Sequence, residues 1–146
     1  MKNRIWLCLP PFLFCLLDQG FTLWNQSEQY WRGHYAVALE ANPVSYRFLS
    51  EHLLIYTVGV MVWILLFLLL IVSLPRRLAM ILSVAITFGH TWGLVGWVMQ
   101  CSVIPGMPGC GSYSAFYGYW ISLTLILVAA IMLVLAWEKS VYPLSK

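Results

Sequence analysis

Charged residues are scarce in this chain of 146 residues. Asp, Glu, Lys and Arg together make up 9% of the sequence, whereas a soluble globular domain usually carries about 25%. Hydrophobic residues make up 62%, and the mean hydropathy is +0.83. So little charge excludes a water-compatible surface. The composition therefore predicts an integral membrane protein whose surroundings are the lipid bilayer.

The motifs of several large enzyme classes are also missing. The sequence contains no spacing typical of a nucleotide-binding P-loop, a dinucleotide-binding loop, a zinc metalloprotease or a nucleophile elbow. The net charge of +3 comes from basic residues at the ends of apolar stretches rather than on one face, which argues against a nucleic-acid partner. The sequence indicates no metal site and identifies no cofactor.

Four apolar stretches are long enough to cross a bilayer, which takes about 20 residues of helix. They lie at approximately residues 5–24, 53–74, 78–99 and 116–137. We therefore predict an all-α fold, with one membrane domain over residues 1–146. It is expected to be a four-helix bundle with a short outer helical segment between the first two spans. The first stretch resembles a secretory signal, but no small-x-small cleavage site follows it, so we expect it to be retained.

The basic residues indicate how the spans are threaded. In a four-span arrangement, Arg32 and Arg47 are the only two on one side of the membrane. The others fall on the opposite side: Lys2, Arg4, Arg76, Arg77, Lys139 and Lys146. Because basic residues are enriched in cytoplasmic loops, both termini are expected to be cytoplasmic.

The first span carries one narrow stripe of small or polar side chains. Cys8, Pro11, Cys15, Asp18 and Thr22 fall on one face of a helix that is otherwise rich in large apolar residues. A charge in the middle of such a helix costs about 2.5–3.5 kcal/mol on insertion scales, so Asp18 needs a partner or an aqueous cavity. Asp18 is a candidate functional residue, and the alternative is a polar contact that only packs helices.

His90 on the third span is the candidate partner of Asp18. Trp24 and Trp97 are expected at the outer interface, where tryptophan is enriched. Asp18 lies six residues before Trp24 and His90 seven before Trp97, so both lie about 9–10 Å below that interface at about 1.5 Å per residue. We therefore expect a polar pocket in the outer half of the bundle, formed by Asp18, Thr22, His90 and Thr91. The alternative is two unrelated contacts to backbone carbonyls or threonine hydroxyls.

Glu40 and Asn42 are polar candidates in the outer segment. The sequence allows a short helix from residue 34 to 41 that stops at Asn42-Pro43. The same dipeptide is typical of a helix start, because Asn caps a helix and Pro is tolerated at its first position. The second span would then extend outward with Arg47 and Glu51 paired at i, i+4. A structural role is favoured for Glu40 and Asn42, and a functional one stays open.

Small residues in the third span predict close helix packing. Gly89, Gly93 and Gly96 bring the small-xxx-small spacing that lets another helix approach. Packing within the monomer is the favoured interpretation, and a homodimer contact is the alternative.

Two cysteines lie in the outer loop between the third and fourth spans. Cys101 and Cys110 flank a stretch rich in Gly and Pro, and a disulfide that closes it suits an oxidising exterior. Metal binding is the weaker alternative, because no His or carboxylate lies nearby in the loop. Cys8 and Cys15 lie inside the first span and are expected to be buried free thiols.

Two short segments resemble a known pattern. Leu17-Asp18-Gln19-Gly20-Phe21-Thr22 followed by Glu40-Ala41-Asn42-Pro43 is similar to the Asp-x3-Thr … Glu-x-Asn-Pro pattern of small multi-spanning bacterial membrane proteins of uncharacterised function. The resemblance implies a protein of the bacterial inner membrane and implies no activity. The third and fourth spans add nothing to it.

Two classes of function fit the sequence. The first is a small accessory subunit or scaffold of a membrane complex, supported by the glycine spacing, the small size and the lack of catalytic groupings. Its partners would be other membrane-protein subunits or a second copy of the chain. The second is a lipid- or small-molecule-handling protein (an enzyme, a binder or a proton-coupled carrier) that uses a pocket formed by Asp18 and His90.

Overall fold

The computed structural model describes residues 2–103 and 115–141, and this part of the chain is helical without a strand. Four helical segments are long and apolar enough to cross a membrane: Arg4–Trp24, Leu53–Ser73, Arg76–Cys101 and Phe116–Val141. The complete order of elements is η1 (Lys2–Cys8), α1 (Leu9–Trp24), α2 (Glu28–Trp31), η2 (Tyr35–Val37), α3 (Pro43–Glu51), α4 (Leu53–Ser73), α5 (Arg76–Val103) and α6 (Ala115–Val141). The predicted all-α class and the four long apolar helices are therefore confirmed. Insertion in a membrane stays a prediction.

The first span is built from two kinds of helix. The 3₁₀ segment η1 leads into α1, which begins at Leu9 with Pro10 and Pro11 in its first turn. Proline fits there because the first N–H groups of a helix have no partner inside it. Arg4 ties this segment to the end of α4, since its guanidinium donates to the carbonyls of Leu74 at 2.7 Å and Val72 at 3.3 Å. These carbonyls belong to a helix end that lacks intrahelical donors.

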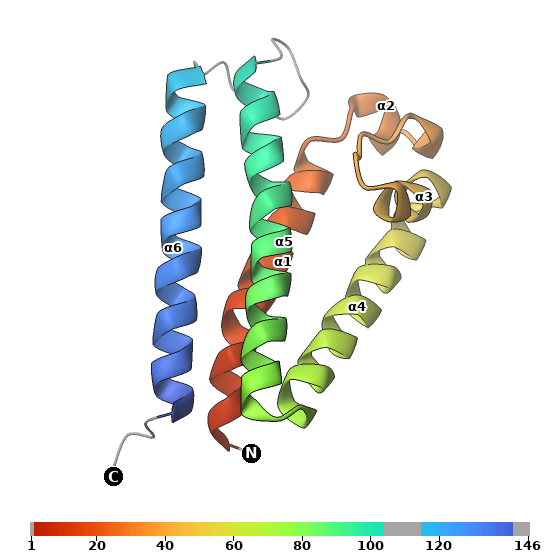
Figure 1. Cartoon of the computed structure of the whole chain (residues 1–146). Helices are drawn as coiled ribbons and strands as arrows, with labels where there is room; N and C mark the ends of the chain where they lie inside the picture. The colour runs from red at the N-terminus through yellow and green to blue at the C-terminus, as the bar shows by residue number, and fades with distance from the viewer. Residues whose placement is uncertain (1, 104–114, 142–146) are drawn as a thin grey trace.

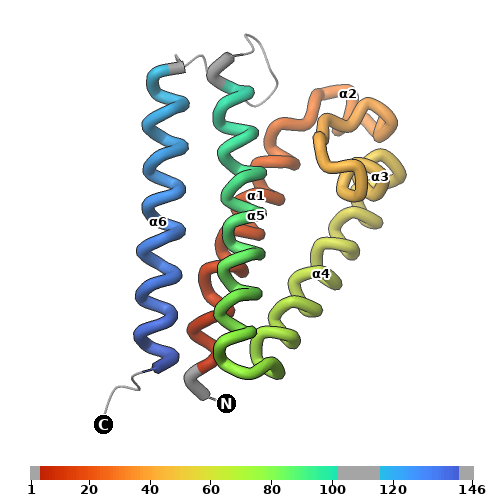
Figure 2. Tube along the Cα trace, viewed as in Figure 1, coloured from red at the N-terminus to blue at the C-terminus, as the bar shows by residue number. Residues whose placement is uncertain are grey.

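The long helices form an uneven bundle. α5 packs against both α1 and α6, and the first span also contacts α6. Figures 1 and 2 show α4 slanting away from α5 toward the end that holds α2 and α3. Both termini lie at the other end, beside the turn between α4 and α5 (Figure 1). This arrangement fits an even number of crossings. Which membrane face holds the termini stays a prediction.

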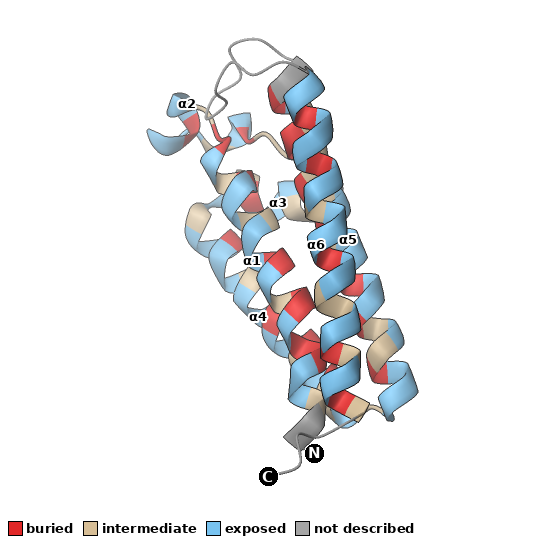
Figure 3. Cartoon of the chain, turned by 90° about the vertical axis from the view of Figure 1, so that its left-hand side faces the viewer, coloured by how far each residue is buried: buried red, intermediate tan, exposed pale blue. Residues whose placement is uncertain are grey.

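The buried faces of the helices point inward, and the outward faces are apolar and exposed (Figure 3). Leu7, Cys15, Phe67 and Ile71 belong to the core at the end of the bundle that holds the termini. Outward side chains such as Phe88 and Leu127 are 66% and 60% exposed. A helix with an apolar outward face is stable in lipid but not in water, so the burial pattern supports the membrane interpretation.

The outer segment differs from the sequence prediction in three ways. A single helix over residues 34–41 is wrong, because only Tyr35–Val37 forms a 3₁₀ turn there. The second span also does not continue outward, because His52 is extended (φ −172°) and caps α4 through its side chain, which accepts from the Leu54 N–H. In the described part of the chain no ion pair joins Arg47 to Glu51. Arg32 and Glu28 form the exposed i, i+4 pair instead.

The disulfide prediction falls partly outside the described residues, because Cys110 lies in 104–114. Cys8 and Cys15 are buried free thiols, as expected. We predict that two of the four cysteines alkylate in denatured protein taken from its native membrane without reductant, and that all four alkylate after reduction. Intact mass measures both states. Alkylation of all four without reductant would contradict the bridge.

Candidate functional site

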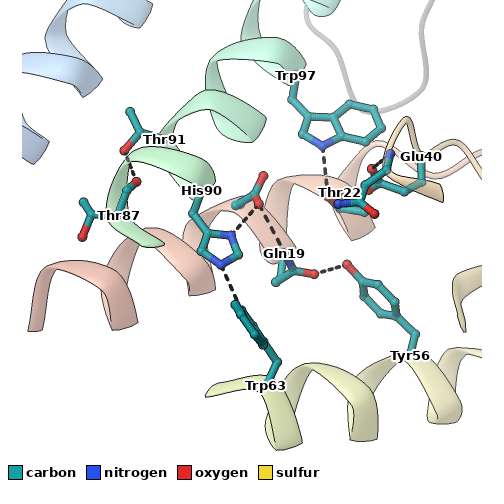
Figure 4. A network of polar contacts seen from close by, with 11 residues as sticks. Gln19, Thr22, Glu40, Tyr56, Trp63, Thr87, His90, Thr91 and Trp97 are labelled. Carbon is teal, nitrogen blue, oxygen red and sulfur yellow. Dashed lines mark hydrogen bonds and ion pairs between the residues drawn. The ribbon is translucent and has the colours of Figure 1, made fainter. Parts of the chain in front are cut away.

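Asp18 and His90 form a direct contact between α1 and α5. His90 Nδ1 lies 2.8 Å from Asp18 Oδ2. The His90 side chain is 15% exposed and the Asp18 side chain 13%, so the pair is largely enclosed. The contact predicted from the sequence is therefore present, and Figure 4 shows His90 directed between α1 and α4.

Gly93 allows the close approach of α1 and α5 at this point. A Cβ atom on Gly93 would lie 2.6 Å from Asp18 Oδ1, closer than real Cβ contacts come. Gly89 and Gly96 differ, because a Cβ atom on either would meet nothing within 4 Å. Of the three predicted packing glycines, Gly93 alone therefore makes room for Asp18.

The third partner of the pair is Trp63 on α4. Its indole N–H donates to His90 Nε2 at 3.3 Å. An indole nitrogen only donates, so Nε2 accepts and carries no proton. The proton of a neutral imidazole then lies on Nδ1 and is donated to the Asp18 carboxylate. The two contacts together therefore define the tautomer of His90.

Gln19 and Tyr56 make a second link between α1 and α4. Gln19 Nε2 donates to Asp18 Oδ2 at 3.5 Å, and the Tyr56 hydroxyl donates to Gln19 Oε1. Figure 4 shows Tyr56 and Trp63 reaching from α4 toward this one stretch of α1 and α5. The Asp18 carboxylate is therefore oriented from two sides, by α5 directly and by α4 through Gln19.

Thr22 connects the outer segment to the bundle. Its hydroxyl donates to Glu40 Oε2 at 3.3 Å and accepts from Trp97 Nε1 at 2.9 Å. Glu40 is thus brought next to a predicted pocket residue, although the sequence alone favoured a structural role for it. Trp97 is 8% exposed, so its indole is buried inside the bundle, and its depth relative to the outer interface stays a prediction.

The side chain of Gln26 holds Glu40 near α1. It donates to the carbonyls of Thr22 and Leu39, both at 2.7 Å, and accepts from the Leu39 N–H at 2.8 Å. Gln26 is 3% exposed, and a buried amide with all of these partners fixes the backbone beside Glu40.

Thr91 and Asn42 lie apart from the Asp18–His90 pair. The Thr91 hydroxyl donates to the carbonyl of Thr87 at 2.7 Å within α5. Figure 4 shows Thr87 and Thr91 on the side of α5 that is turned away from Gln19. The contacts of Thr91 are thus within α5, and its place in the predicted pocket stays a prediction. Asn42 caps α3, because its Oδ1 accepts from the N–H groups of Val44 at 2.9 Å and Ser45 at 3.2 Å. This is the predicted structural role.

Burial raises the pKa of Glu40 above its ordinary value, and the nearby Asp18 carboxylate raises it further. A carboxyl with a raised pKa binds its proton more tightly in the folded state. Its protonated form therefore stabilises the fold at low pH, and this contribution is lost as pH rises through the raised pKa.

We predict that Glu40→Gln removes this pH dependence. From pH 4.5 to 7.5 the thermal midpoint of the wild-type protein in detergent should fall relative to that of the variant. Glu51→Gln is the matched control on the exposed α3, and it should track the wild type. A constant difference between wild type and Glu40→Gln over this range would contradict a raised Glu40 pKa.

The described residues offer no group of three or more His, Cys, Asp or Glu side chains placed to hold a metal ion. Buried side-chain nitrogen and oxygen atoms in the same part of the chain all have hydrogen-bond partners. The site is thus a closed network of neutral donors around the Asp18 and Glu40 carboxyl groups.

Four members of this network were not identified from the sequence: Gln19, Tyr56, Trp63 and Trp97. Gln19 follows Asp18 directly, and its position was the one available signal. The two tryptophans are typical both of membrane interfaces and of buried donors, and the sequence does not distinguish these roles.

The chain was compared with known proteins, and no protein-family model, curated protein or solved structure matches it. Its function must therefore be argued from the site.

Proposed function

We propose that this chain is a membrane protein that binds an amphiphilic small molecule or lipid at the Asp18–His90 pair. The observation that carries this proposal is the 2.8 Å contact between His90 Nδ1 and Asp18 Oδ2, within two helices that are otherwise apolar. Ionisable groups inside membrane spans are costly, and they commonly mark ligand or proton sites. A few convergent polar groups in apolar surroundings are also the usual composition of a small-molecule site.

Helices in this bundle can be joined without the free-energy cost of placing an ionisable pair in lipid. Near the other end of the bundle, α5 is joined to η1 by a neutral hydrogen bond, in which the Ser83 hydroxyl donates to the Leu7 carbonyl at 2.7 Å. A bond of this kind joins helices without placing a charge in lipid. An aspartate and a histidine at the middle of the bundle therefore point to binding beyond packing.

The location of the protein belongs to the same proposal. We place both termini in the cytoplasm, because most basic residues lie at that end of the threading. The resemblance to small bacterial membrane proteins supports the inner membrane of a bacterium. The ligand would then reach the pair from within the bilayer or from its outer side.

Photocrosslinking tests the proposal. The full chain is purified with membrane lipid and exposed to photoactivatable, alkyne-tagged lipids, and labelled peptides are mapped. We expect labels on α1, α4 or α5 near residue 18 or 90, reduced at least about fivefold in Asp18→Asn, since a neutral amide holds the proton on His90 Nδ1 less strongly than the carboxylate does and leaves the imidazole a poorer partner for a ligand. Glu51→Gln is the control for loss of a carboxylate elsewhere. Labelling that is the same in wild type and Asp18→Asn would refute the site.

An accessory subunit or scaffold is the second candidate. A Cβ atom on Gly89 or Gly96 would meet nothing within 4 Å, and Phe88 and Trp92 beside them are stacked at 6.4 Å and exposed. This face of α5 is a possible contact for another helix. Affinity purification in mild detergent tests it, because a scaffold should carry a stoichiometric partner, in wild type and Asp18→Asn alike.

A further inference from the structure

The hydrogen bonds around His90 turn one acceptor, Nε2, toward α4, while both bonds to the Asp18 carboxylate end at Oδ2 and Oδ1 lies against Gly93. Asp18 Oδ2 accepts from Gln19 Nε2 and from His90 Nδ1. The Tyr56 hydroxyl donates to the side-chain oxygen of Gln19. His90 Nε2 faces the opposite way, toward α4, and its partner is the indole N–H of Trp63. Nε2 is therefore an acceptor that Asp18 has oriented in advance, since the carboxylate holds the proton on Nδ1.

We propose that Trp63 occupies the place of the ligand, and that the ligand presents an uncharged hydroxyl to His90 Nε2. This inference rests on the proposed function, because it names the chemical class that the Asp18–His90 pair would bind. When the ligand enters, its hydroxyl replaces the Trp63 indole N–H as the donor to His90 Nε2. Trp63 is then a gate that fills the site when the ligand is absent.

Trp63 is held loosely enough for this exchange. Its hydrogen bond of 3.3 Å is at the long end of the range for N–H donors, and the residue is 47% exposed. Its ring has an edge contact with Phe67 at 5.8 Å. Rotation of the indole toward lipid breaks one long hydrogen bond and keeps an apolar environment for the ring.

The depth of the contact favours an uncharged group. Trp63 lies ten residues into α4, which begins at Leu53, so the contact is about 15 Å from the outer end of that span at 1.5 Å per residue. On α1 the contact lies six residues before the end of the helix at Trp24, about 9 Å at the same rise, so it lies well inside a hydrocarbon layer of about 30 Å. A charged head group is costly at that depth, whereas one hydroxyl that keeps a hydrogen bond is tolerated.

The charges of the surrounding residues exclude an anionic head group. The titratable groups that face the pair are Asp18 itself, Cys15 on the same helix, Tyr56 on α4 and Glu40 in the outer segment. Two of these are carboxyl groups, and the described hydrogen bonds and ion pairs bring no Lys or Arg to His90 or Asp18. A phosphate or carboxylate would be repelled here.

A matched pair of probes tests the inference. The full chain in liposomes is exposed to a photoactivatable, alkyne-tagged long-chain alcohol or to its O-methyl ether. The ether has the same chain but cannot donate. We expect the alcohol to label the site about tenfold more than the ether, because one lost hydrogen bond at a buried acceptor costs about 1–2 kcal/mol.

Trp63→Phe is the decisive variant, because Phe keeps the apolar ring and removes the competing donor. Alcohol labelling should rise several-fold in Trp63→Phe and stay unchanged in Trp92→Phe, an exposed tryptophan on α5. Equal or lower alcohol labelling in Trp63→Phe overturns the gate. Equal labelling by alcohol and ether, still lost in Asp18→Asn, overturns the hydroxyl and leaves the proposed function intact. Labelling by both probes that is independent of Asp18 overturns the proposed function as well.

Discussion

Gly93→Ala is expected to destabilise the bundle by about 1–3 kcal/mol, the usual cost of an extra methyl group in a well-packed site. The new Cβ would lie 2.6 Å from Asp18 Oδ1 and 3.0 Å from Oδ2. The carboxylate cannot move away freely, because His90 and Gln19 both donate to it. Relief of the clash therefore weakens the contact between α1 and α5.

Gly89→Ala provides the control on the same helix, one turn away. A Cβ at Gly89 meets nothing within 4 Å, so the alanine brings only its helix preference. We expect this variant to be more stable than wild type by up to about 1 kcal/mol. Unfolding in detergent, followed by helicity at increasing denaturant, measures both variants. Two substitutions that change stability by the same amount and in the same direction would contradict the close approach at Gly93.

The location of the four spans could be predicted from the sequence because length and apolar composition decide it. The predicted ends, such as residues 5–24 and 53–74, lie close to the observed Arg4–Trp24 and Leu53–Ser73. Helix starts that depend on one local cap were also predictable, as Asn42 before Pro43 shows. These features depend on neighbouring residues in the chain, so a single sequence contains them.

The Asp18–His90 contact was predicted from depth markers whose membrane positions stay predictions. Trp97 served as a depth marker at the interface, but its indole N–H donates to Thr22 inside the bundle. The pair still forms, because the first and third spans run in the same direction and Gly93 leaves room for the carboxylate. The sound part of the prediction was the free-energy cost of placing Asp18 in an apolar helix, because only a polar partner offsets that cost.

The contribution of α4 could not be predicted. This helix is apolar on all sides, so its sequence has no periodicity to indicate which face turns inward. Tyr56 and Trp63 are recognised as site residues only when the rotation of α4 is known. The link from Glu40 to Thr22 has a similar origin, because it depends on Gln26 holding the backbone at Leu39.

Removal of the His90 imidazole should be the most damaging change in the site. His90→Phe leaves the Asp18 carboxylate 13% exposed with the single long bond from Gln19. Loss of a hydrogen bond to a buried charged group typically costs about 1.5–3 kcal/mol, and here the carboxylate that remains has lost its main donor. Asp18→Asn removes that charge and keeps an oxygen that accepts from His90 Nδ1, so we expect it to cost less.

The double variant should therefore be more stable than His90→Phe alone, since no uncompensated carboxylate remains. We expect a coupling free energy of about 1–3 kcal/mol from the complete double-mutant cycle, measured by denaturant unfolding in detergent. The exposed Glu28–Arg32 pair, whose side chains are 78% and 70% exposed, supplies the matched control. Its cycle with Glu28→Gln and Arg32→Gln should show a coupling below about 1 kcal/mol. Additive effects at Asp18 and His90, no larger than in the exposed pair, would show that the two side chains do not act together and would remove the physical basis of the site.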